Sequence, residues 1–110
     1  MSSRRQTQVA ESIAHLAGLF FARESNYESL ITVTRADVSP DLKNATVYFS
    51  VMPESKEEGV LHFARRNRVE FRDFLKSKSR MKFLPFVDFV IDYGEKHRQH
   101  IDELTRKASE

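Results

Sequence analysis

Positive charge is concentrated in one segment of this 110-residue chain, residues 64–82. The segment holds eight of the eighteen lysines and arginines but only two acidic residues, so its net charge is +6 (eight minus two). The whole chain carries +2, and the remainder therefore sums to −4 (+2 minus +6). Clustered cations attract phosphate, so this separation indicates a surface for a polyanion such as nucleic acid. The eight cations are Arg65, Arg66, Arg68, Arg72, Lys76, Lys78, Arg80 and Lys82.

Two sets of residues at helical spacing occupy this segment and the turn before it. The apolar set, which would face a core, comprises Val60, Ala64, Phe71, Phe74 and Leu75. The basic set, on the flank beside it, comprises Arg65, Arg68, Arg72 and Lys76. A single surface cation often serves only solubility, so the binding hypothesis rests on the concentration of charge.

The candidate RNA-binding residues are these eight cations, together with Asn67 among them and Arg4 and Arg5 in the first helix. The helix dipole disfavours cations in a first turn, and either a nearby phosphate or plain solvent would offset that cost.

Catalytic and metal-binding chemistry has little support in the sequence. His97 and His100 lie three residues apart and could hold a metal with Asp102 or Glu103, but this signal is weak. The sequence has no HExxH motif, no G-x-S-x-G elbow, no phosphate loop and no cysteine. We therefore expect a protein that is not an enzyme and that takes no metal, cofactor or small-molecule substrate.

Composition predicts one globular domain. Hydrophobic residues make up 40% of the chain and charged residues 31%, and nine phenylalanines with no tryptophan predict a phenylalanine core. The absence of cysteine fits a reducing compartment. No apolar run is long enough to span a membrane, and the first twelve residues lack the hydrophobic stretch of a secretion signal. We expect a cytoplasmic protein.

Hydrophobic periodicity predicts an α+β fold with the order α-β-β-α-α-β and an appended helix. The predicted helices are residues 4–23, 54–79 (with a bend) and 95–107, and the predicted strands are residues 30–38, 45–52 and 84–93. A β-bulge near Arg35 and Ala36 would keep Arg35 out of the core. Asp88 and Asp92 are expected to face solvent. A hairpin followed by a helical crossover gives a three-stranded mixed sheet with its helices on one face. Residues 1–93 would form the domain, with 94–110 loosely docked.

Several short motifs resemble the ribosome-binding factor A family over residues 4–92. The most specific is a strand, a Ser-x-Asp-Leu turn and x-Ala-x-Val-Tyr within residues 31–51, ITVTRADVSPDLKNATVYFSV. The Arg4–Arg5 and Val9 pattern resembles the first helix of that family. Residues 72–75 (RDFL), residues 80–85 (RMKFLP) and a strand ending at Asp92 are similar to its later motifs.

The resemblance implies a type II KH-like domain that binds the free small (30S) ribosomal subunit through 16S rRNA. It implies assistance in late maturation, including processing of the 5′ end of the precursor, with most importance in the cold. The KH Gly-x-x-Gly loop is replaced here by Asn67-Arg68-Val69, and a helix break is still expected near Asn67. A monomer is expected. The alternative is a protein-interaction or dimerisation module that uses a sheet edge and Tyr48.

Overall fold

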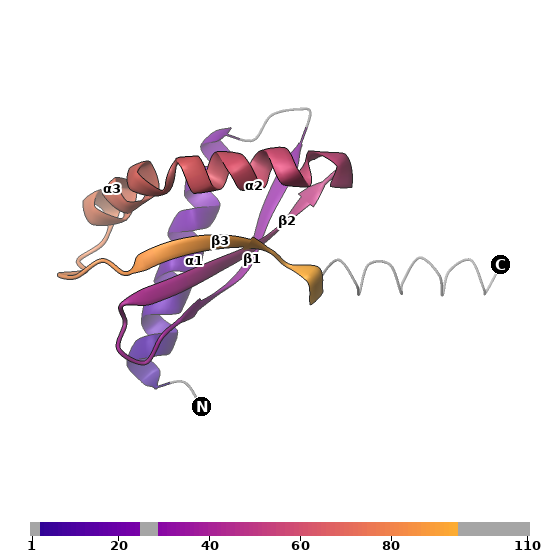
Figure 1. The fold of residues 1–110 in the computed structure, drawn as a ribbon. Helices are drawn as coiled ribbons and strands as arrows, with labels where there is room; N and C mark the ends of the chain where they lie inside the picture. Colours follow the sequence, from indigo (N-terminus) through magenta and orange to yellow (C-terminus); the bar gives the residue numbers. More distant parts are fainter. Residues whose placement is uncertain (1–2, 25–28, 95–110) are drawn as a thin grey trace.

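In the computed structural model, residues 3–24 and 29–94 are described, and they follow the predicted order (Figure 1). The elements are α1 (Arg4–Glu24), β1 (Leu30–Val38), β2 (Asn44–Met52), a 3-10 turn η1 (Glu54–Lys56), α2 (Glu57–Arg66), α3 (Arg68–Lys78) and β3 (Phe86–Ile91). The predicted helix over residues 95–107 lies outside the described residues. No described helix is long and apolar enough to cross a membrane.

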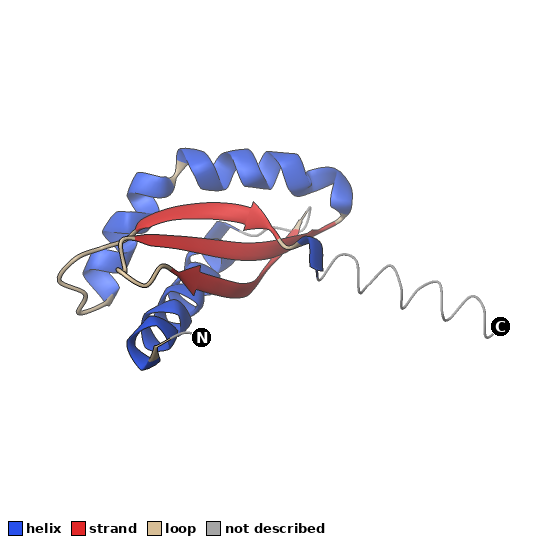
Figure 2. Cartoon of the chain, turned by 60° about the horizontal axis from the view of Figure 1, so that its bottom comes forward, coloured by secondary structure: helices blue, strands red, loops and turns tan. Residues whose placement is uncertain are grey.

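The three strands form one mixed sheet in the order β1-β2-β3 (Figure 2). β1 and β2 pair antiparallel through the tight hairpin, and β2 and β3 pair parallel through the crossover made by α2 and α3. Alternate residues of β2 and β3 are buried under the helices, which cover one face of the sheet. The predicted α+β class and sheet arrangement are confirmed.

The predicted bulge in β1 lies at Thr34, one residue before the expected position. Val33 pairs with Phe49 and Arg35 pairs with Tyr48, so Thr34 has no partner in the register. The extra residue turns Arg35 outward, where its guanidinium lies 3.8 Å from the centre of the Tyr48 ring. Arg35 therefore partly covers the ring that the dimerisation alternative would use.

Phenylalanine rings from four elements form the centre of the core. Phe21 of α1, Phe49 of β2, Phe71 of α3 and Phe89 of β3 are all fully buried. The ring centre of Phe89 lies 5.4 Å from those of both Phe21 and Phe71. Edge-to-face contacts at this distance add to the hydrophobic gain of burial.

Asn67 breaks the crossover helix as expected. Its φ of −103° and ψ of 23° lie outside the helical region, and its side-chain amide donates to the carbonyl of Phe63 at 2.7 Å. Ala64 of α2 and Phe71 of α3, on either side of the break, both lie in the core. Val69, two residues after the break, stays 72% exposed.

Two expectations for the third strand were wrong. β3 is shorter than residues 84–93, and Asp92 is buried, with only 8% of its surface exposed. The Thr34 hydroxyl donates to the Asp92 carboxylate, and the Asp92 N–H donates to the Phe49 carbonyl at 2.8 Å. The bulge supplies a buried carboxylate with a hydrogen-bond donor, without which burial would be costly.

Truncation of the central rings provides a test of this packing. Phe71→Ala should lower the free energy of unfolding by about 3–5 kcal/mol, because it leaves a cavity between α3 and the sheet. Phe74→Ala should cost less, because Phe74 is only partly buried. Urea denaturation of the two variants measures the difference. Equal losses would contradict the assignment of Phe71 to the core centre.

Candidate nucleic-acid interface

Of the eight lysines and arginines of residues 64–82 that were predicted to bind RNA, six are exposed and form no ion pair with any described residue. They are Arg66, Arg72, Lys76, Lys78, Arg80 and Lys82. Arg4 and Arg5 are also exposed, at the start of α1. These side chains therefore keep their charge available to a ligand.

Arg65 and Arg68 have a partner within the protein. Both approach the Asp88 carboxylate of β3, with Arg65 Nε 3.5 Å from its oxygen and the Arg68 guanidinium hydrogen-bonded to the same atom. Arg65 also donates to the Phe89 carbonyl at 3.3 Å, and Arg68 lies over the Phe86 ring. β3 is an edge strand, and the bond from Arg65 occupies one carbonyl of its backbone.

The arginines change the acidity of Asp88. Partial burial alone would raise the pKa of Asp88, but the hydrogen bonds from Arg68 and the Phe89 N–H, with the charges of Arg68 and Arg65, outweigh burial. The pKa of Asp88 therefore lies below its ordinary value. Asp88 does not simply face solvent as expected, because it is the shared acceptor for two arginines.

Asn67, another predicted RNA-binding residue, also has a structural role. Its amide is engaged by the Phe63 carbonyl, so its side chain shapes the bend between the two basic helices. The residues that sequence reasoning placed in one interface thus fall into two groups, one with partners inside the protein and one without described ion pairs. Arg65, Asn67 and Arg68 hold the helices and the sheet edge in position, while the cations from Arg72 onward remain free of ion pairs with the described residues.

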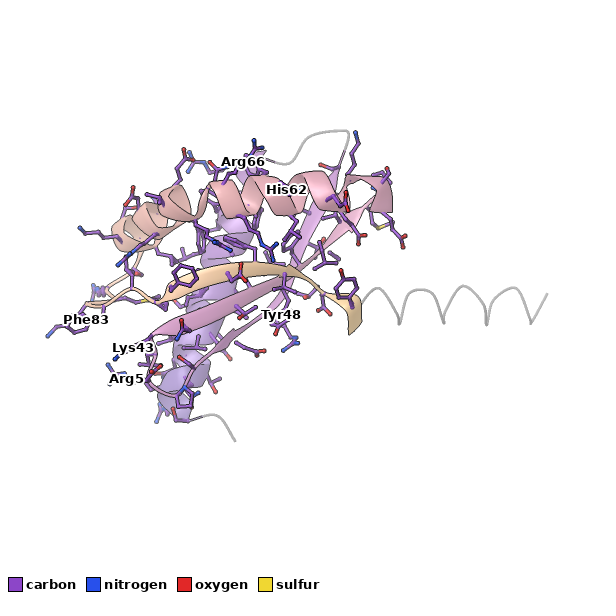
Figure 3. The ribbon with its side chains drawn as sticks, in the orientation of Figure 1. Arg5, Lys43, Tyr48, His62, Arg66 and Phe83 are labelled. Carbon is purple, nitrogen blue, oxygen red and sulfur yellow. The ribbon has the colours of Figure 1, made fainter. Side chains whose placement is uncertain are left out.

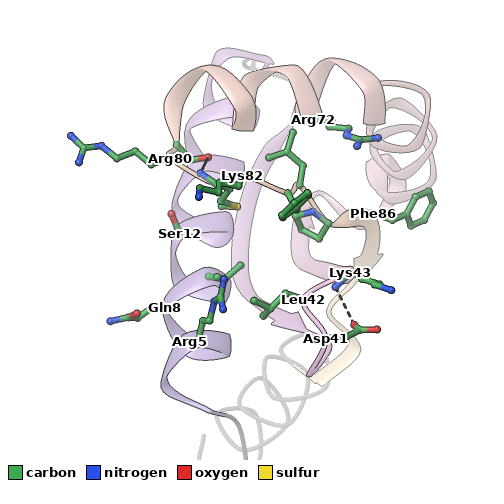
Figure 4. A pocket seen from close by; sticks show the side chains of 16 residues that line it. Arg5, Gln8, Ser12, Asp41, Leu42, Lys43, Arg72, Arg80, Lys82 and Phe86 are labelled. Carbon is green, nitrogen blue, oxygen red and sulfur yellow. Dashed lines mark hydrogen bonds between the residues drawn. The ribbon is translucent and has the colours of Figure 1, made fainter.

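A groove gathers cations from three separate parts of the chain (Figure 4). It encloses about 980 Å³ between the start of α1, the β1–β2 turn and the loop from α3 to β3. Its cations are Arg5, Lys43, Arg72, Arg80 and Lys82. Its apolar residues include Val9, Leu42, Met81, Leu84 and Pro85. Four of the predicted site residues therefore meet here, and Lys43 joins them.

Hydrogen bonds hold the turn that forms one side of the groove. The Asp41 carboxylate accepts from the Ser39 hydroxyl at 2.6 Å and from the Lys43 N–H at 3.1 Å, and these bonds lower the pKa of Asp41. Leu42 has a φ of 61°, which a leucine adopts only where the surrounding structure enforces it. Both Leu42 and Lys43 line the groove, and the Leu42 side chain points toward Arg5 of α1 (Figure 4).

The candidate residues chosen from the sequence did not include Lys43, Phe83 or Phe86. Phe83 is 88% exposed and Phe86 is 61% exposed, and both line the groove. Phe83, Lys43 and Arg5 lie at one end of the molecule, whereas Arg66 lies on α2 (Figure 3). Lys43 directly follows the Ser-x-Asp-Leu turn, but no periodic pattern linked it to α3.

The possible metal residues His97, His100, Asp102 and Glu103 lie outside the described residues. Within residues 3–24 and 29–94, no group of three or more His, Asp or Glu side chains is placed to hold a metal ion.

The element order and the mixed sheet covered on one face define an α+β domain of the order α-β-β-α-α-β. A family model described as ribosome-binding factor A matches residues 4–105. The chain belongs to the ribosome-binding factor A family, which comprises ribosome assembly factors and not enzymes.

Relatives and solved structures agree with this assignment. Ribosome-binding factor A of Chloroherpeton thalassium is 37% identical over 114 aligned positions, which cover 98% of this chain and 90% of the relative. The protein of Ruegeria sp. is 35% identical over 82% of this chain and 72% of its own length. The crystal structure of the Thermus thermophilus protein has a TM-score of 0.68 at 22% identity, covering 78% of this chain and 94% of that one.

A second Thermus thermophilus structure is similar to this chain and concerns a complex. It is a homology model of ribosome-binding factor A fitted into a cryo-EM map of a 30S complex. Its TM-score is 0.62 at 23% identity, and the match covers 82% of this chain and 93% of that one.

The Asp88 pair predicts a pH effect on stability. The folded pKa of Asp88 is depressed, so its contribution is complete above the unfolded value of about 3.9 and is lost as pH falls through the folded pKa. Asp88→Asn should lower the free energy of unfolding at pH 7 by about 1 kcal/mol, a small value because the side chain stays 38% exposed. Urea unfolding at pH 7 and pH 3 measures this. A deficit of the variant that is as large at pH 3 would contradict the ion pair.

Proposed function

We propose that this protein binds the free small (30S) ribosomal subunit through 16S rRNA. We further propose that it assists late maturation of that subunit, including processing of the 5′ end of the precursor rRNA. The proposal rests on the exposed cations of α3 and the following loop, which form no ion pair with the described residues. The chain that carries them belongs to the ribosome-binding factor A family. The fitted 30S complex of the Thermus thermophilus relative supports the choice of partner.

Electrostatics gives the binding its strength. Each lysine or arginine that neutralises an rRNA phosphate releases condensed counterions, so affinity falls steeply with salt. Arg72, Lys76 and Lys78 are exposed on α3, and the loop adds Arg80 and Lys82. Such contacts set position and affinity without reading sequence. We propose that the protein acts as a cytoplasmic monomer, since one copy carries the whole cationic surface.

Charge removal on α3 tests the proposal directly. Arg72→Gln combined with Lys78→Gln should weaken co-sedimentation with purified 30S subunits and reduce the log–log salt slope of binding by about two. The thermal midpoint should stay within about 2 °C, because neither side chain has a described ion pair.

The matched control removes two positive charges elsewhere. Arg35→Gln combined with Lys56→Gln changes residues of β1 and η1, neither of which lines the groove. This control should co-sediment nearly as well as the unaltered protein. Equal loss in both double variants would show that net charge alone governs binding and would refute the assigned face. Salt-independent self-association without subunit binding would support the dimerisation alternative.

A further inference from the structure

We propose that the groove between α1, the β1–β2 turn and the α3–β3 loop takes an unpaired RNA nucleotide, with its base against Phe83 and its flanking phosphates on the surrounding cations. The proposal deepens the proposed function, on which it rests, by naming the form of RNA that this groove selects.

Phe83 is placed for a ligand and not for the core. It is the most exposed of the large hydrophobic residues described, at 88%, and it forms no ring or cation–π contact with the described residues. By comparison, Phe86 beside it is covered by the Arg68 guanidinium, 5.4 Å from its ring centre. A bare phenyl ring at the mouth of a basic groove can stack on a nucleobase of any identity.

The charge around Phe83 complements a nucleotide backbone. Five cations line the groove and the only acid among its described lining residues is Asp41, so the local charge is +4 (five minus one). The carboxylate of Asp41 is turned to the Ser39 hydroxyl and the Lys43 N–H. Arg5, Arg72 and Lys82 come from three different segments and have no described ion-pair partner, so phosphates on either side of a base could be held together.

The apolar surface distinguishes an unpaired nucleotide from a duplex. Leu42, Met81 and Leu84 line the groove and would cover the face or edge of a base. In an RNA helix the bases are stacked on each other, so their faces are closed to an aromatic side chain and a protein meets phosphates, sugars and base edges. A duplex would gain from the cations but not from Phe83 or the apolar residues. The size of the groove, about 980 Å³, admits a nucleotide.

Fluorescence anisotropy with two labelled RNAs tests the inference. The probes are a ten-nucleotide oligouridylate, which has little stacking of its own, and a blunt ten-base-pair RNA duplex. The Phe83→Leu variant should bind the single strand about 10-fold more weakly than the unaltered protein does. Its affinity for the duplex should equal that of the unaltered protein. Phe83→Trp should restore or improve single-strand binding, because it returns an aromatic face. The matched control is Tyr93→Leu, which removes an exposed aromatic residue beyond the other end of β3 and should change neither affinity.

The outcomes separate this inference from the proposed function. If Phe83→Leu leaves single-strand affinity unchanged while Arg72→Gln/Lys78→Gln loses 30S co-sedimentation, the groove assignment is overturned and the proposed function stands. If Phe83→Leu weakens 30S co-sedimentation but not RNA affinity, the ring contacts a protein and the inference is again overturned. Equal affinity of the unaltered protein for the single strand and the duplex would also overturn it. If the unaltered protein binds neither RNA nor 30S subunits, the proposed function itself fails.

Discussion

Contact between phenylalanine rings of four elements is the interaction on which the rest of the structure depends. Phe89 of β3 lies at the centre, and its ring contacts Phe21 of α1 and Phe71 of α3. Both helices must therefore pack on the same face of the sheet. Ala64 and Phe71 are seven residues apart, so they lie on the same side of the crossover and both reach that face, and the helix breaks between them at Asn67 without a glycine. The position of the basic surface thus follows from the packing of the core.

The arginines of the crossover divide into two groups according to which of them reach Asp88. This acid on the edge strand engages Arg65 and Arg68, and Arg65 also bonds to the Phe89 carbonyl on the backbone of β3. Arg72, one turn beyond Arg68, has no such acceptor among the described residues and remains available at the groove. One helical flank therefore holds the sheet edge in its first part and leaves its cations exposed in its second.

Much of this fold could be predicted because its signals are local and periodic. The strand over residues 30–38 and the apolar alternation of β2 came directly from side-chain patterns, and the outward phase of Arg35 required a bulge. Contacts between distant segments could not be predicted in this way. The burial of Asp92 depends on Thr34, 58 residues earlier, and the pairing of Asp88 with Arg65 and Arg68 depends on how the crossover lies on β3. Lys43 and Phe83 belong to one groove only after the sheet has formed.

Charge and shape contribute differently to recognition at this groove. Free cations attract any RNA, and by themselves they would hold the protein on duplex and single strand alike. Selection requires a feature that only one form of RNA can use, and an exposed aromatic ring above apolar residues is such a feature. The hydrogen-bonded turn keeps Leu42 and Lys43 at the groove before any ligand arrives, so little ordering is needed on binding. A rigid groove with both properties can therefore favour an unfinished RNA region, in which nucleotides are still unpaired, over one that has completed its helices.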